Sequence, residues 1–185
     1  MVNKLALIIS VMLTAIFLAS TYGFLHNQIS YLISEQYFTK LKFSQLWSMD
    51  YLLEHPRLGA GLIGIISTWW FGMLSGLISG IIASSQSQFR AAWKSAIDAI
   101  IRILGITAIG SLIGILVGTF IVSQLNVNWH LPVGITEERR FLIAGTMHTF
   151  SYIGGVIGLI YGIKFQVQLS NADFQSTSSS TKKKC

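Results

Sequence analysis

The sequence predicts an all-α fold: a polytopic membrane helical bundle with four transmembrane helices, glycine-ladder packing and both termini in the cytoplasm. Three observations support this prediction: an apolar composition, four long apolar runs, and glycines at every fourth position in three of those runs. Of the 185 residues, 52% are hydrophobic and only 11% are charged, whereas soluble domains carry about 25% charged residues. The mean hydropathy of +0.60 also indicates a membrane domain.

Each apolar run is at least as long as a helix needs to be to cross a bilayer, about 20 residues. We expect one domain, 1–168, with spans at approximately 5–25, 58–83, 97–125 and 141–165. The first run follows Lys4 and therefore also fits a signal peptide. Its length and its poor match to a small-residue cleavage site favour an uncleaved span.

Two polar segments adjoin these spans. In 88–97, Phe89 and Trp93 share one helix face while Arg90 lies on another, as in a cytoplasmic amphipathic helix. This segment is either an interfacial helix or the solvated start of the third span, and both interpretations stay open. The last segment, 169–185, is rich in Ser, Thr and Lys, which predicts a disordered cytoplasmic tail.

The Lys and Arg residues near the span ends predict the orientation of the chain. With both termini in the cytoplasm, the inner side carries eight of these bases and the outer side five. The inner bases are Lys4, Arg90, Lys94, Arg102, Lys164 and Lys182–Lys184, and the outer bases are Lys40, Lys42, Arg57, Arg139 and Arg140. Because the bases lie at the ends of apolar runs and form no polar face, we expect no nucleic-acid partner.

The last three spans carry glycines spaced four residues apart, so that each set lies along one helix face. These are Gly72, Gly76 and Gly80, then Gly110, Gly114 and Gly118, then Gly154, Gly158 and Gly162. In lipid, small residues at this spacing let two helices approach closely. We therefore expect a glycine-packed core of three helices, with the first span at its periphery. The alternatives are a homo-oligomeric interface or a pore lining.

The segment 26–57 is expected to form an ordered extracytoplasmic cap over the bundle. Apolar and polar residues alternate over 29–33, which predicts a short extended piece, and Ser34 is a suitable N-cap for a helix that follows it. The segment is also rich in aromatic residues, which favour the membrane interface.

Seven residues are candidates for ligand binding: His26, Gln28, Glu35, Tyr37, Phe38, His148 and Tyr152. His148 lies about two turns into the fourth span, and ionisable groups at membrane depth are usually functional. It is either a structural histidine, bonded by polar neighbours, or a ligand, metal or proton site. At matching depth His26 and His148 can meet, with Glu35 as a third partner, and two histidines and a carboxylate can hold a metal. The spacing matches no metal-ligand pattern, so we assign no metal and no cofactor.

The runs HNQISYLISEQYFTK, TWWFGMLSG and GTMHTFSYIGG resemble a group of small four-span bacterial membrane proteins. In that group a His-x-Gln element and an Ile-Ser-x-Glu-Tyr-Phe-like element follow the first helix. The resemblance extends over the spans and is most specific from His26 to Phe38. It implies a four-span architecture and a shared role for a group of residues, without assigning a reaction. These residues are His26, Gln28, Glu35, Tyr37 and Phe38.

The sequence favours a non-enzymatic binding or accessory protein of the cell membrane, either the bacterial inner membrane or an internal photosynthetic membrane. No nucleophile elbow, HExxH motif or Walker loop is present, and no catalytic residue is assigned. The only cysteine, Cys185, excludes a disulfide within the chain. The expected partners are the lipid bilayer and a second copy or another membrane subunit. The alternatives are a small homo-oligomeric transporter or channel and, less favoured, a metal-assisted membrane enzyme.

Overall fold

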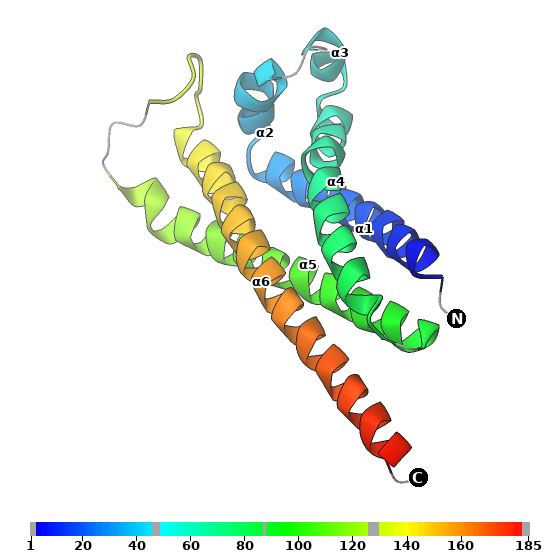
Figure 1. Ribbon diagram of the computed structural model, residues 1–185. Coiled ribbons are helices and arrows are strands. Elements are labelled where there is room, and N and C mark those ends of the chain that lie inside the picture. Colours follow the sequence, from blue (N-terminus) through cyan, green and yellow to red (C-terminus); the bar gives the residue numbers. More distant parts are fainter. Residues whose placement is uncertain (1–2, 46–48, 87, 126–129, 183–185) are drawn as a thin grey trace.

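The computed structural model describes residues 3–45, 49–86, 88–125 and 130–182, so Lys183, Lys184 and Cys185 lie outside it. In this part of the chain no strand occurs, and four helices are long and apolar enough to cross a membrane. They are α1 (Lys4–Ile33), α4 (Pro56–Ala83), α5 (Phe89–Phe120) and α6 (Glu138–Lys182) (Figure 1). The predicted all-α fold with four spanning helices is confirmed, and it fits a multi-pass membrane protein.

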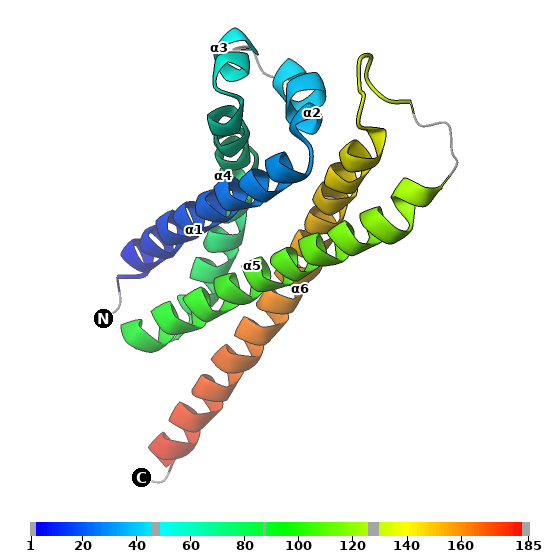
Figure 2. The ribbon, with the colours of Figure 1, turned by 180° about the vertical axis from the view of Figure 1, so that it is seen from behind.

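The cap between α1 and α4 is itself helical. It comprises α2 (Glu35–Tyr37), the π-helix η1 (Phe38–Lys42), the 3-10 helix η2 (Phe43–Gln45) and α3 (Met49–Glu54). Outside the cap, a 3-10 turn, η3 (Val122–Gln124), follows α5. Phe38 and Phe43 are fully buried and pack with Ile63 of α4 and Phe141 of α6. The N-terminus and the C-terminal end of α6 lie at the opposite end of the bundle from this cap (Figures 1 and 2).

The extended piece predicted over 29–33 is wrong, because α1 continues as a helix to Ile33. The alternation of residue types there reflects helix faces: Asn27 and Ser30, three residues apart, are both buried against other helices. Ser34 ends the helix in an extended conformation, and its hydroxyl accepts a hydrogen bond from the amide of Tyr37, which caps α2.

Two further segments are helical beyond their predicted bounds. Residues 89–97 form the first turns of α5 and continue into the third span without a break, with Ala92 and Ala96 fully buried. The last helix, α6, reaches Lys182, where we predicted an unstructured tail from residue 169. No glycine or proline follows Gly162, so no residue of the tail stops the helix.

The four long helices pack as two crossing pairs, α1 with α4 and α5 with α6 (Figures 1 and 2). This arrangement corrects the predicted three-helix core with α1 at its periphery. α1 buries a stripe of every fourth residue, which consists of Leu7, Val11, Ala15, Ala19 and Gly23. The stripe packs against α4, and its first residues also contact the start of α5. Of the stripe residues only Gly23 is a glycine, so the spacing of glycines in the sequence does not indicate the stripe.

The nine glycines named above all lie at one of these two helix contacts. A Cβ added at Gly76 of α4 would lie 2.8 Å from Cα of Met12 in α1. A Cβ at Gly158 of α6 would lie 2.8 Å from the carbonyl oxygen of Ile103 in α5. Such distances leave no room for a side chain, so the helix backbones pack directly against each other.

We predict that Gly158→Leu destabilises the α5–α6 pair, because the new side chain would push the backbones apart at a cost of about 3 kcal/mol. The matched control is Gly105→Leu in α5, where an added Cβ meets no atom within 4 Å. Thermal melts in detergent should show a large fall for Gly158→Leu and little change for Gly105→Leu. Equal melting temperatures in the two variants would contradict the packing argument.

The orientation of the chain in the membrane is tested with reporter proteins fused at Asn171, in the C-terminal part of α6. With the C-terminus in the cytoplasm, a fluorescent protein at this position should mature and fluoresce, and alkaline phosphatase there should be inactive. Active phosphatase would place the C-terminus outside and reverse the predicted topology.

Candidate functional site

A cavity of about 400 Å³ lies between the α1–α4 pair and the α5–α6 pair. All four long helices contribute to its lining, and the cap adds Lys42 of η1. The lining includes Tyr22 and His26 of α1, Phe71 of α4, Thr107 of α5, and His148 and Tyr152 of α6. Most of the other lining residues are apolar or glycine, and Asn27, Ser67 and Thr68 add further polar groups.

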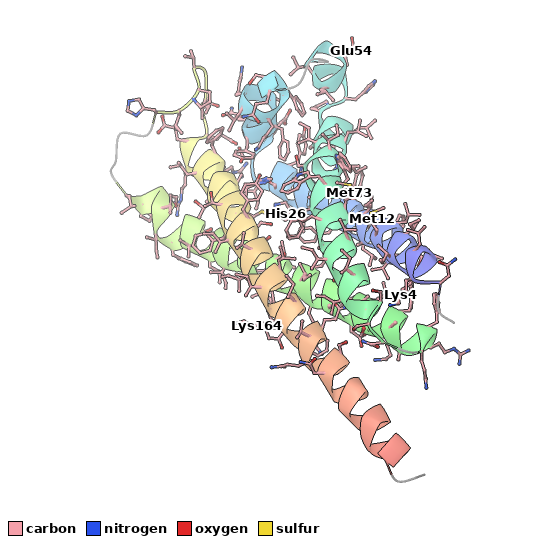
Figure 3. All side chains as sticks on the ribbon, viewed as in Figure 1. Lys4, Met12, His26, Glu54, Met73 and Lys164 are labelled. Atoms are coloured by element: carbon pink, nitrogen blue, oxygen red, sulfur yellow. The ribbon has the colours of Figure 1, made fainter. Side chains whose placement is uncertain are left out.

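His26 and His148 meet in this cavity, as their expected depths in the bundle allow. Their ring centroids are 4.7 Å apart and the rings are nearly perpendicular. Only 7% of His26 and 5% of His148 are exposed, so both imidazoles are held inside the protein. Figure 3 shows His26 among the side chains between the crossing helices.

The cap covers His148 directly. The ring of Tyr37 stacks on His148 with centroids 4.9 Å apart, and Phe38 meets it edge-on at 6.2 Å. On its other side, Nε2 of His148 lies 3.0 Å from the Ser30 hydroxyl of α1. α1, α6 and the cap are therefore joined at one buried imidazole.

His26 belongs to a hydroxyl network that links three helices. The Tyr22 hydroxyl lies 2.9 Å from Oγ of Ser111 and 3.2 Å from Oγ of Ser151. Nδ1 of His26 lies 3.4 Å from the Tyr22 hydroxyl and 3.3 Å from Oγ of Ser111. When Nδ1 accepts from Tyr22, the neutral ring carries its proton on Nε2.

Nε2 of His26 is buried and has no hydrogen-bond partner among the described residues. An unpaired buried polar atom costs about 1–3 kcal/mol, which makes such atoms rare outside functional sites. His26 also lines the cavity, although its Nε2 is buried and does not itself face the open space.

Lys42 contributes the cation of the cavity. Its Nζ lies 5.6 Å from the ring centroid of Tyr37, and among the residues whose side chains are described no carboxylate lies within ion-pair distance of it. Burial in the cap lowers the pKa of Lys42, because the charged amine loses water without gaining an anion. Burial also raises the pKa of Tyr37, so this phenol stays neutral beside the amine.

The other predicted site residues fall into two groups. Tyr37, Phe38 and Tyr152 surround His148. Gln28 and Glu35 do not line the cavity: Gln28 exchanges hydrogen bonds with Arg57 at the start of α4, and Glu35 is exposed.

The proposed metal triad of His26, Glu35 and His148 is not assembled. Within the described residues, no three histidine, cysteine, aspartate or glutamate side chains are grouped closely enough to hold a metal. Glu35 begins α2 on the exposed side of the cap, while both histidines lie beneath it. The hypothesis that Glu35 completes a metal site is therefore wrong.

Sequence reasoning missed several residues of the site. Tyr22 and Ser30 each lie four residues from His26, on the same face of α1, and this spacing could have identified both. Ser111 and Ser151 lie within glycine-rich spans, where the sequence does not distinguish them from packing residues. Lys42 was counted only toward the orientation of the chain.

No family model, curated protein or solved structure matches the chain. The chemistry of the site is therefore inferred from its own residues and distances.

We predict that Lys42 makes stability depend on pH. Its folded pKa lies below the usual value for lysine, about 10.4, so at pH values between the two the unfolded chain binds more protons. Stability contributed by this group is therefore lowest at neutral pH and rises with pH through that alkaline window.

The measurement compares melting temperatures of the wild type and Lys42→Met from neutral to alkaline pH. The wild type should gain stability relative to Lys42→Met as pH rises, while the exposed Lys40→Met control keeps the wild-type slope. An identical pH dependence in wild type and Lys42→Met would show that burial of Lys42 has no such effect.

Proposed function

We propose that this protein binds an amphiphilic small molecule in the cavity between its two helix pairs, as a non-enzymatic binding or accessory protein. The observation that carries the proposal is the mixed lining of the cavity, which includes polar residues, called here its polar part, and apolar residues, its apolar part. His26, with its unpaired Nε2, and Lys42 belong to the polar part. Ile63, Leu104 and Val156 belong to the apolar part, so a polar head and an apolar body would both find suitable surroundings.

The exposure of the lining residues supports entry of the ligand from the bilayer. Trp70 of α4 and Tyr152 and Val156 of α6 line the cavity, yet each is more than half exposed, between 51% and 59%. The cavity therefore reaches the surface that faces lipid between α4 and α6. A molecule dissolved in the membrane can enter there without passing through the cap.

The membrane in this proposal is the cell membrane, either the bacterial inner membrane or an internal photosynthetic membrane, with the cap on the extracytoplasmic side. The excess of inner-side bases supports this orientation. The cap then lies over the polar part of the cavity, and the expected partner is the lipid bilayer with the amphiphiles it contains.

The two rival functions have weaker support. A pore lined by glycines would need those faces to be free, and the nine glycines pack against helices of the same chain. A metal-assisted enzyme would need a set of metal ligands, and among the described residues no three histidine, cysteine, aspartate or glutamate side chains are grouped closely enough to form one. Neither of these two functions accounts for the mixed polar and apolar lining of the cavity.

Filling the cavity tests the proposal. At Gly155 an added Cβ would make ordinary contacts, the nearest 3.6 Å from Phe71, so Gly155→Leu occupies the cavity without a collision at its Cβ. Gly105→Leu again serves as the control for added bulk on a transmembrane helix.

Native mass spectrometry and extraction of co-purified lipids should show an amphiphile enriched on the wild type and on Gly105→Leu. Occupancy should fall at least about tenfold in Gly155→Leu, because the new side chain occupies part of the cavity. Equal occupancy in all three proteins, or no enrichment over the bulk membrane lipids, would refute binding in this cavity.

A further inference from the structure

The chemistry of the ligand can be narrowed because the cavity lies in a membrane. Moving an apolar tail from lipid into a protein cavity gains almost no hydrophobic free energy, since lipid chains are as apolar as leucine side chains. The apolar lining around Leu104 and Val156 therefore accommodates a tail but does not select one. Selectivity over bulk lipid has to come from the polar part of the cavity.

The polar part of the lining contains one cationic side chain, Lys42. Among the residues whose side chains are described, Lys42 has no carboxylate partner, and the surrounding rings of Tyr37 and His148 cannot neutralise it as an anion would. A cationic head would be repelled by Lys42, and an uncharged head would leave its charge unpaired. An anionic head matches it.

We propose that the ligand is a single-chain amphiphile with a carboxylate head, the chemistry of a long-chain fatty acid. The carboxylate pairs with Lys42, the cationic side chain of the lining. This inference rests on the proposed function, because it concerns the same cavity.

The size of the cavity supports one chain and not two. Its volume of about 400 Å³ lies toward the lower end of the roughly 300–1,000 Å³ that is usual for small-molecule sites. A phospholipid would have to place two long chains and a larger head in this space. A fatty acid needs room for one chain and a head of three heavy atoms.

The geometry also explains why Lys42 is placed in the cap and not on a spanning helix. η1 lies outside the four spans, so its amine reaches the cavity from the interfacial end. A carboxylate at that position stays near the membrane surface while its tail extends along the helices. Pairing with a carboxylate would oppose the effect of burial on the pKa of Lys42.

The test compares radiolabelled palmitate with hexadecanol, which has the same chain length and no charge. The full-length protein is held in phosphatidylcholine nanodiscs, and binding to empty nanodiscs is subtracted. Four variants are measured with the wild type: Lys42→Met, Lys42→Arg, Lys40→Met and Gly155→Leu. Lys40 is the matched control because it lies in the same helix, is exposed and does not line the cavity.

Palmitate should bind the wild type more than about tenfold tighter than hexadecanol, since loss of a buried charge pair costs at least that factor. Lys42→Met should lose this preference and still bind hexadecanol, whereas Lys42→Arg and Lys40→Met keep it. Gly155→Leu should exclude both probes.

Other outcomes separate the inference from the proposed function. If the wild type binds both probes equally, or Lys42→Met keeps the preference, the carboxylate assignment is overturned and binding in the cavity stands. If phosphatidylglycerol in the nanodisc displaces palmitate, the site takes a two-chain lipid and the single-chain assignment is overturned. If neither probe binds the wild type, both proposals fail.

Discussion

Close approach of helix backbones within each pair is the constraint on which the rest of the structure depends. Because lipid provides no hydrophobic force between helices, association relies on contacts that only small residues allow. Ala15 and Gly23 on α1, and Gly114 and Gly158 on the other pair, supply such contacts. These contacts hold helices within a pair, whereas the pairs meet through side chains, such as Leu7, Ala83 and Ile100 in one buried cluster, and leave a cavity between them.

Side-chain hydrogen bonds connect the two pairs where the small residues do not. Tyr22 reaches Ser111 and Ser151 in the half of the bundle nearer the cap, and the amide of the fully buried Gln166 donates to the carbonyl of Ser79 at 2.8 Å in the other half. Each bond joins a residue of the α1–α4 pair to one of the α5–α6 pair. Backbone contacts thus build the pairs, and polar side chains set how the pairs face each other.

The spans could be predicted from the sequence because length and hydropathy depend on each helix alone, and the meeting of His26 and His148 followed from their depths. The role of α1 could not be predicted in this way, since its contact stripe mixes alanine with larger residues. Glu35 was assigned to the site because it is close to His26 in sequence. The turn at Ser34 places it on the opposite side of the cap, which depends on tertiary packing.

The order of the helices along the chain has a consequence for biogenesis. Each pair consists of consecutive spans, so the first can associate before the second has been synthesised. The contacts of Tyr22 with Ser111 and Ser151, which lie 89 and 129 positions further along the chain, form only after both helix pairs have been synthesised. The cavity is therefore completed last, and a ligand within it stabilises only the fully assembled chain. Availability of that ligand would then govern how much newly inserted protein escapes membrane proteolysis.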